Sequence, residues 1–310
     1  MNYSGQINPC LSCVSTLNYG RKLNRLDNKV DWSRILTWLV ILAGVYFGLV
    51  ALIYLFQNRF IYHPESRIWR TPADVGLEYE RVEFSASDGV QLSGWFIPHE
   101  EARAVMLYFH GNAGNLADRV EFLSLLHTLN ISIFGIDFRG YGESEGTPTP
   151  RGTLKDAEAA WEYLVEKRDI PPDRIVIYGR SLGGTIASWL ATRHEPKALI
   201  LGSTFTSAAD MAKEMFPFIP VDFLINIPYK TREYLQQIHC PVLISHSTQD
   251  DVVPFYHGEE LFQVANEPKE FLELRGAHDD VVFTSRETYI QGMGAFLSKY
   301  AEQPKHLQNR

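Results

Sequence analysis

The chain has 310 residues, of which 45% are hydrophobic and 21% charged, a composition typical of globular proteins with a substantial core. Its net charge of −8 at pH 7 argues against a nucleic-acid partner. Its three cysteines, Cys10, Cys13 and Cys240, are too few for a disulfide framework.

Residues 1–34 form a polar N-terminal tail with a net charge of +3, which leaves −11 for the rest of the chain. Cys10 and Cys13 lie in this tail at the spacing of a metal-binding pair. A structural zinc site needs about four ligands, and no second pair accompanies them. We therefore expect an unstructured tail and no metal site.

Residues 35–56 form an apolar run that contains no charged residue. As a helix, this run is long enough to span a hydrocarbon core of about 30 Å. A signal peptide would have a shorter apolar region and a small-residue cleavage site, whereas the bulky segment Gln57–Tyr62 follows here. Because the run is apolar on all faces, it favours an uncleaved membrane anchor over a buried core helix.

Basic residues are more numerous before this run than after it. Three follow it, at Arg59, Arg67 and Arg70, and five precede it, at Arg21, Lys22, Arg25, Lys29 and Arg34. Cytoplasmic flanks of membrane helices are enriched in Lys and Arg. The sequence thus predicts a single-pass membrane protein with a cytoplasmic N-terminus and a catalytic domain on the non-cytoplasmic side.

A juxtamembrane link at 57–79 precedes a pattern of strands and helices over residues 80–303. Residues 81–86 and 91–97 alternate in polarity around Asp88-Gly89, which predicts an antiparallel hairpin. Apolar runs of strand length follow at 104–109, 131–137, 174–178, 198–201, 241–245 and 270–274. Helical segments alternate with them, at about 120–129, 154–167, 185–191 and 288–299. This order predicts an α/β fold with a mostly parallel sheet covered on both faces.

Three loops that follow predicted strands carry residues suited to acyl transfer, and ligands of open α/β sheets bind at this edge. The first is His110–Asn115, whose small residues allow a backbone N–H to face a reacting carbonyl. Asn112, or with less support Ala113, is the candidate oxyanion donor. We interpret His110 as structural, because it precedes the candidate nucleophile in the chain.

The segment Gly179–Gly184 places Ser181 on a sharp turn between a strand and a helix. This is the context of the G-x-S-x-G nucleophile turn, in which small residues let strand and helix approach each other. The backbone N–H of Leu182, at the helix N-terminus, can stabilise an oxyanion. The alternative is an ordinary glycine-rich turn with a solvent-facing serine.

The two later loops offer an acid and a base. Asp250 and Asp251 follow one predicted strand, and either can orient a histidine or cap the next helix. His278 follows the last strand, whereas His257 lies near a helix start and His306 lies in the charged tail. A serine, an acid and a histidine in this chain order match a Ser-Asp-His triad.

The chain resembles the α/β-hydrolase superfamily from about residue 80 to 300. More narrowly, it is similar to membrane-anchored serine hydrolases with an N-terminal signal anchor, among which lysophospholipases, acyl-protein thioesterases and carboxylesterases are known. Four motifs carry the resemblance: the segments 61–64 (IYHP), 110–115 (HGNAGN), 137–146 (DFRGYGESEG) and 179–184 (GRSLGG). The resemblance implies an acyl hydrolase whose substrate is a small or lipid-like ester.

The resemblance also selects between the two acids. The family's acid loop reads HGxxD, and here it is His246-Ser247-Thr248-Gln249-Asp250, with serine in place of glycine. The usual GGH is Gly276-Ala277-His278. Both replacements are small residues, so the spacing still implies Asp250 as the acid and His278 as the base. The predicted chemistry needs no cofactor or metal.

About forty residues separate the strands at 198–201 and 241–245, which is too long for a plain loop. In the family, an insertion at this position forms a cap over the nucleophile, so we expect a small helical cap at about 205–237. Its apolar residues are Met211, Met215, Phe216, Phe218, Ile219, Val221, Phe223, Leu224, Ile225 and Ile227. Methionines and aromatics form adaptable apolar walls, which predicts a site for an acyl chain. The alternative is that these residues only pack the cap onto the core.

Two other functions remain compatible with the sequence. One is a non-catalytic module of the same fold that binds a ligand at the membrane. Such modules generally lack a triad residue, and all three are present here. The other is an acyltransferase that uses the same serine with an alcohol in place of water.

Overall fold

Helix α1 (Trp32–Ile61) is a continuous helix of 30 residues that opens the described part of the chain. Within residues 31–301 as described, it is the one helix long and apolar enough to cross a membrane. Large side chains along it are exposed, among them Trp38 at 65%. Exposed apolar surface on this scale is unfavourable in water. The helix is therefore a candidate transmembrane span, and it continues five residues beyond the predicted run.

The computed structural model describes residues 31–301 except 220 and 226. Residues 1–30 of the predicted tail, with Cys10 and Cys13, lie outside the described residues, and its last three residues already belong to α1. The chain divides into two units between Leu49 and Val50. The last turns of α1 therefore belong to the same unit as the hydrolase-like domain.

The predicted link 57–79 has its own secondary structure. It contains the end of α1, the two-residue strand β1 (His63–Pro64) and the 3-10 helix η1 (Pro72–Val75). Strand β1 pairs in parallel with β5 (Ala113–Gly114), in the loop that carries the oxyanion candidate. A segment expected to be a simple connection is thus paired to the candidate site.

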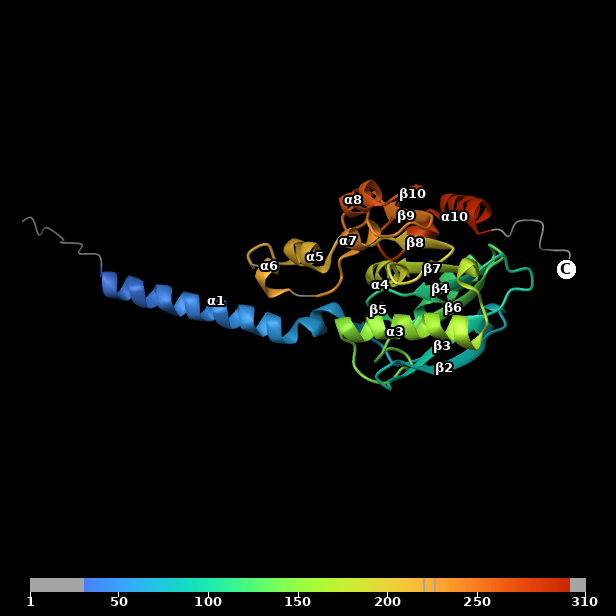
Figure 1. Cartoon of the computed structure of the whole chain (residues 1–310). Coiled ribbons are helices and arrows are strands. Elements are labelled where there is room, and N and C mark those ends of the chain that lie inside the picture. The colour runs from blue at the N-terminus through green and yellow to red at the C-terminus, as the bar shows by residue number, and fades with distance from the viewer. Residues whose placement is uncertain (1–30, 220, 226, 302–310) are drawn as a thin grey trace, which may run out of the picture. The chain divides into compact units, whose positions relative to one another are not determined.

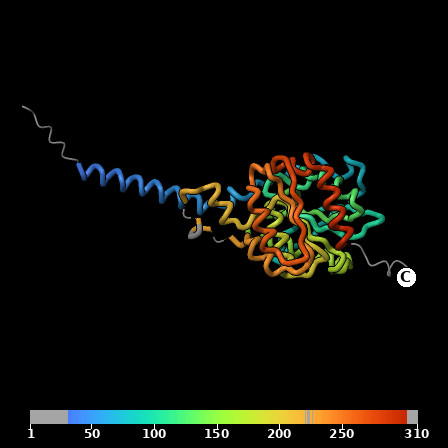
Figure 2. The backbone as a smooth tube through the Cα atoms, turned by 90° about the horizontal axis from the view of Figure 1, so that it is seen from above, coloured from blue at the N-terminus to red at the C-terminus, as the bar shows by residue number. Residues whose placement is uncertain are grey.

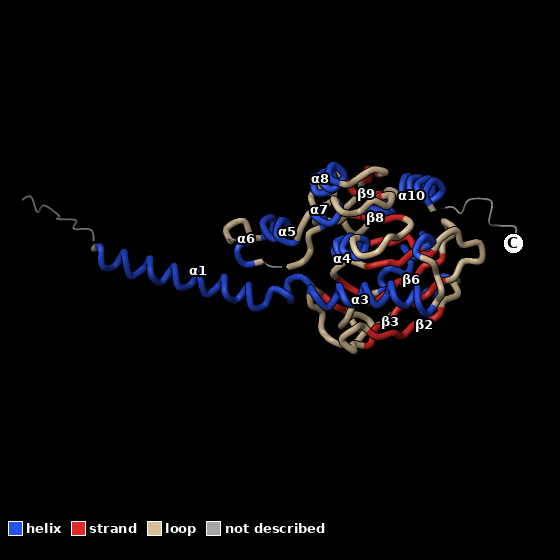
Figure 3. The backbone as a smooth tube through the Cα atoms, viewed as in Figure 1, coloured by secondary structure: helices blue, strands red, loops and turns tan. Residues whose placement is uncertain are grey.

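The main sheet has eight strands in the order β10-β9-β8-β7-β4-β6-β3-β2 (Figures 1 and 3). The strands are β2 (Glu80–Ser85), β3 (Gln91–Ile97), β4 (Val105–Phe109), β6 (Ser132–Asp137), β7 (Ile175–Arg180), β8 (Ala198–Gly202), β9 (Val242–Ser247) and β10 (Lys269–Leu274). Strands β2 and β3 form the predicted antiparallel hairpin, and β3 joins β6 antiparallel. All other neighbours are parallel, so the α/β-hydrolase fold with a mostly parallel sheet is confirmed.

Helices cover both faces of this sheet. The α-helices after α1 are α2 (Val120–His127), α3 (Pro150–Glu162), α4 (Leu182–Ala191), α5 (Ala208–Met215), α6 (Val221–Leu224), α7 (Thr231–Leu235), α8 (Tyr256–Val264), α9 (Val281–Thr284) and α10 (Arg286–Tyr300). Shorter helical turns are η2 (Leu116–Arg119), η3 (Tyr163–Lys167) and η4 (Pro172–Arg174). The predicted insertion contains α5, α6 and α7.

Side-chain alternation along the buried strands builds two cores. In β4, Leu107 and Phe109 belong to one core, together with residues of α3, α4 and α8. Met106 and Tyr108 belong to the other, with residues of α2 and α10. Successive side chains of a strand point to opposite faces, so a run that is apolar throughout requires helices on both sides. The carboxyl ends of the parallel strands therefore remain as the accessible edge for a site.

A buried ion pair holds the segment after β6 against the first turns of α3. The Arg139 guanidinium is 8% exposed, and its Nη2 lies 2.7 Å from Oδ1 of the fully buried Asp156. Asp156 also accepts the backbone N–H of Arg139 at 2.9 Å. Asp88, in the turn of the β2–β3 hairpin, forms a second ion pair with the guanidinium, with its Oδ2 at 2.9 Å from Nη1. One cation thus joins the hairpin, the β6 loop and α3.

We expect Asp156→Ala to lower the free energy of unfolding by about 3–5 kcal/mol, because it leaves a buried charge without its main partner. The neighbouring Lys155→Ala is the matched control, since its pair with Asp88 is partly exposed and contributes about 1 kcal/mol or less. Denaturant midpoints in one detergent, followed by tryptophan fluorescence, compare the two variants. Equal small changes would show that this pair does not anchor the loop.

Candidate active site

Ser181 lies between the end of β7 and the start of α4 with a backbone that residues other than glycine rarely adopt. Its φ is 52° and its ψ is −118°, and it is 9% exposed. Its N–H donates to the Gly202 carbonyl at 2.9 Å, and its own carbonyl accepts from Gly184 and Thr204. Bonds on both sides of the residue hold this strained turn, which is the predicted nucleophile geometry.

The glycines around Ser181 are required by close approach of the backbone. A Cβ at Gly179 would lie 2.2 Å from the Gly183 carbonyl oxygen, and a Cβ at Gly183 would lie 2.2 Å from the Phe109 carbonyl oxygen. Neither carbonyl can move without disturbing the strand or the helix. Strand β7, helix α4 and strand β4 can therefore meet only where these positions lack a side chain.

The predicted acid and base meet at the same edge of the sheet. Asp250 and His278 follow β9 and β10, which are neighbouring parallel strands. The His278 Nδ1 lies 2.8 Å from Oδ2 and 3.0 Å from Oδ1 of Asp250. Burial opposes ionisation of this carboxyl, but hydrogen bonds from His278 and from two backbone N–H groups lower the pKa of Asp250. Asp250 is therefore an ionised partner for the imidazole.

The competing acid has a different position. Asp251 accepts the backbone N–H of His278 at 2.9 Å through Oδ1, and the structure brings Asp250 to the ring instead. His246 also contacts the acid loop, which sequence reasoning missed. Its Nε2 lies 2.9 Å from the Val253 carbonyl oxygen and 3.6 Å from Oδ2 of Asp250. Burial lowers the pKa of His246, so it holds the acid loop as a neutral ring.

Arg180 joins the nucleophile turn to the histidine loop. Its guanidinium is buried and donates to the backbone carbonyl of His278. In the described residues no hydrogen bond joins the Ser181 hydroxyl to His278. Such contacts often tighten only when substrate binds. The contact between Arg180 and His278 has one sequence signal, which is a charged residue at the end of a buried strand, directly before the candidate serine.

The oxyanion candidates lie beside the serine. A Cβ on Gly111 would be 3.6 Å from the Ser181 Cβ, so the loop that contains Asn112 passes next to the candidate nucleophile. Leu182 opens α4, and the first N–H groups of a helix have no partner within it. His110 is fully buried, with Nε2 at 3.4 Å from Asp137, as its structural interpretation expects.

The segment at the end of α1 is hydrogen-bonded to this loop. The Asn112 side chain donates to the Ile61 carbonyl at 3.1 Å, and the Asn112 carbonyl accepts the His63 N–H at 3.0 Å. Tyr141 donates its hydroxyl to the same carbonyl at 2.6 Å. The tyrosine hydroxyls of Tyr62 and Tyr229 lie 2.5 Å apart. These bonds give a structural reason for the predicted motif at 61–64.

A cavity of about 270 Å³ opens beside Ser181. Asn112, Ser181 and Leu182 line it, and most of its other lining residues are apolar side chains of the cap and of α1. Val252 and Val253, whose N–H groups bind Asp250, also line it. The cavity therefore joins the serine, both oxyanion candidates and the acid loop.

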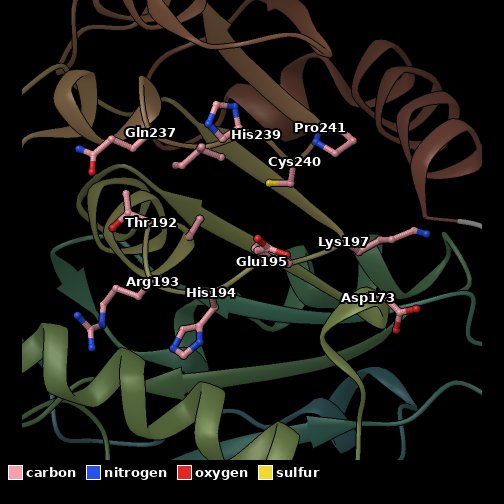
Figure 4. Close-up of a pocket in the computed structure, with 13 residues that line it drawn as sticks. Asp173, Thr192, Arg193, His194, Glu195, Lys197, Gln237, His239, Cys240 and Pro241 are labelled. Carbon is pink, nitrogen blue, oxygen red and sulfur yellow. The ribbon is translucent and has the colours of Figure 1, made fainter.

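A second hollow, of about 580 Å³, lies at the opposite ends of the strands (Figure 4). Its lining includes residues just before three strands: Asp173 before β7, Lys197 before β8 and Pro241 before β9. Arg193 and other polar residues complete it. Cys240 also borders this hollow, and burial raises the pKa of its thiol to about 12. The thiol is therefore protonated at neutral pH and is a weak nucleophile.

Comparisons with known proteins agree with this geometry. Residues 104–226 match the family model described as the alpha/beta hydrolase fold. An alpha/beta hydrolase domain-containing protein of Arabidopsis thaliana, WAV2, is 36% identical over 290 residues, which cover 85% of this chain and 94% of that protein. A Mycobacterium tuberculosis protein is 34% identical over 271 residues, covering 86% and 96%.

Among solved structures, an esterase of Pyrococcus furiosus superimposes with a TM-score of 0.64 at 20% sequence identity. The match covers 78% of this chain and 98% of the esterase. An alpha/beta hydrolase of Penicillium aligns with a TM-score of 0.62 at 19% identity, over 73% of this chain and 99% of that chain. At such low identity these structures establish the fold.

Proposed function

This chain belongs to the α/β-hydrolase superfamily, and we propose that it is a membrane-anchored serine hydrolase that cleaves carboxylic ester or thioester bonds. The fold and its esterase neighbours support hydrolysis of ester bonds in general. The observation that carries the finer proposal is the hydrogen-bonded pair Asp250–His278 at the sheet edge where the strained Ser181 opens onto a cavity.

In the proposed mechanism, the Ser181 oxygen attacks the carbonyl carbon of the substrate while His278 takes the hydroxyl proton. Asp250, ionised and bonded to Nδ1, fixes the ring and stabilises its cation. The backbone N–H groups of Asn112 and Leu182 are the proposed donors to the oxyanion. When the intermediate collapses, the bond to the leaving alcohol or thiol breaks and His278 returns the proton to it. Water then releases the acid by the same steps.

The cap gives this site an apolar side, which supports acyl chains as substrates. Met211 and Phe216 line the cavity from the cap, and Ile227 lines it where the cap returns toward the sheet. The two other functions compatible with the sequence differ in outcome. A binding module would show no turnover, and an acyltransferase would transfer the chain to an alcohol.

We also propose that α1 anchors the enzyme in a membrane, with residues 35–56 as the span and residues 80–303 as the hydrolase domain. The uncharged composition of the run and the exposure of its large side chains support this. The excess of basic residues before the span favours a non-cytoplasmic hydrolase domain.

We expect Ser181→Ala to abolish both ester hydrolysis and labelling by a fluorophosphonate probe. Triad knockouts in a serine protease lose on the order of a million-fold in kcat. Hydrolysis of 4-nitrophenyl acetate and gel fluorescence measure the two losses in the same preparation. Activity equal to wild type in a folded, pure variant would refute the mechanism.

We expect Asp250→Asn to reduce kcat about ten-thousand-fold, because it removes the charge that orients and stabilises the imidazole. Asp251→Asn is the matched control, since an asparagine oxygen still accepts the His278 backbone N–H. Steady-state kinetics of both variants under identical conditions provide the test. If Asp251→Asn is the inactive variant, the acid is assigned one residue too early.

We expect the full-length chain to stay in the membrane fraction after washes with about 1 M salt and with alkaline carbonate. At about 1 M salt the Debye length is only about 3 Å, so surface charge attraction is screened. Insertion of an apolar helix depends on the hydrophobic effect, which such salt does not screen. Immunoblots of pellet and supernatant measure the distribution. Recovery of the intact chain in the supernatant would rule out the anchor.

A further inference from the structure

One wall of the cavity beside Ser181 is formed by the last turns of α1. Ile53, Gln57 and Ile61 line the cavity, and they are partly buried while the other residues between 51 and 61 are exposed. A spacing of four residues places the three side chains on one face of the helix. From Ile53 to Ile61 this face extends for about 12 Å.

The cap supplies the facing wall. Helix α5 and the residues after it contribute Met211, Met215 and Phe216 to the cavity. The rings of Phe60 and Phe216 meet edge to face with centroids 6.2 Å apart. Both backbone views show α5 and α6 beside the C-terminal part of α1 (Figures 1 and 2). The cavity is therefore a space between the cap and the end of the anchor helix.

The chemistry of the lining selects an uncharged, apolar ligand. Among the described residues that line the cavity there is no Asp, Glu, Lys or Arg. Its polar side chains include Ser181, Asn112 and His63 at the catalytic end and Gln57 on α1. The volume of about 270 Å³ is near the lower end of small-molecule sites, roughly 300–1,000 Å³. This size suits one hydrocarbon chain whose carbonyl lies at the serine.

The position of this wall along the chain indicates where the hydrocarbon comes from. Ile53 and Tyr54 belong both to the cavity lining and to the uncharged run 35–56. On the cap, Met215 and Phe218 are 59% and 89% exposed. Apolar side chains exposed next to a membrane helix are stabilised by lipid. A bilayer that holds the run 35–56 would therefore meet this wall of the cavity at Ile53 and Tyr54.

We propose that α1 forms one wall of an acyl-chain site, and that the substrate is an acyl ester or thioester whose chain enters from the bilayer. This inference rests on the serine-hydrolase function proposed above. The anchor helix then sets chain-length specificity in addition to holding the enzyme at the membrane. Each buried methylene is worth up to about 0.8 kcal/mol, so kcat/KM should rise several-fold per two carbons until the cavity is full.

The test uses the full-length enzyme in phosphatidylcholine vesicles with 4-nitrophenyl esters from acetyl to palmitoyl. Ile53→Trp fills the cavity from α1, and the matched control Leu55→Trp adds the same ring at a position that is 74% exposed. We expect Ile53→Trp to lower the ratio of kcat/KM for the dodecanoyl ester to that for the acetyl ester at least tenfold. Leu55→Trp should keep the wild-type ratio.

A second variant, Gln57→Trp, repeats the test one turn further along the same face, and fluorophosphonate labelling reports whether each variant is folded. A wild-type rate that falls steadily from acetyl, or an unchanged ratio in both cavity variants, overturns the inference. If Ser181→Ala remains inactive in that case, the hydrolase function stands and only the acyl wall is refuted. If Ser181→Ala retains activity, the proposed function itself fails.

Two natural-type substrates in the same vesicles distinguish the source of the chain. One is a dodecanoyl lysophosphatidylcholine, an oxygen ester of a lipid. The other is a peptide with an S-dodecanoyl cysteine, a thioester. Loss of activity in Ile53→Trp but not in Leu55→Trp, on either substrate, supports the acyl wall, and equal activity of the two variants on both contradicts it.

Discussion

The strained backbone of Ser181 is the constraint on which the rest of the site depends. A left-handed φ at a residue with a side chain costs free energy, and it persists only where neighbouring contacts enforce it. Here the contacts come from Gly202 on β8 and from Thr204 after it, while glycines at 179 and 183 let β7, α4 and β4 meet. The sheet therefore determines where the hydroxyl lies, and the loops need only bring the candidate acid, base and oxyanion donors to that point.

Those loops are connected to one another by backbone contacts as well as by the candidate side chains Asp250 and His278. Arg180 donates to the backbone carbonyl of His278, and Asp251 accepts the backbone N–H of His278, so the backbone of His278 is held on both sides. His246 holds the Val253 carbonyl in the loop that carries Asp250. Arg180 and His246, which sequence reasoning gave no role in the site, thus hold the loops of the Asp250–His278 pair together with Asp251, the acid that was not selected. Preorganisation of this kind reduces the reorganisation that catalysis requires.

The fold and the identity of the candidate residues could be predicted because the signals are local. Apolar runs of strand length, glycines around Ser181 and the chain order of serine, acid and histidine each depend on a few adjacent residues. The choice of Asp250 over Asp251 needed the family spacing, and the hydrogen bonds to His278 now supply a geometric reason. The catalytic roles themselves are still predictions.

The packing of the end of α1 was the feature that the sequence did not reveal. A charge-free run predicts a membrane span by composition alone, and composition does not show which of its side chains face a cavity. Ile53, Gln57 and Ile61 are partly buried and line the same cavity as cap residues such as Met211, which follows them by 150 residues or more. Long-range packing of this kind leaves no local pattern. The predicted boundary at 56/57 therefore fell inside a helix that continues to Ile61.

The hydrogen bonds at this junction have a mechanical consequence. A flexible linker would let the hydrolase-fold domain sample many distances from α1. Here no linker intervenes, because Ile61 and His63 are bonded to Asn112 and strand β1 pairs with β5. The last turns of α1 are thus held in place relative to the proposed oxyanion site. A substrate chain that packs along those turns would have its carbonyl delivered to one position, which is how a membrane anchor can contribute to orientation as well as to location.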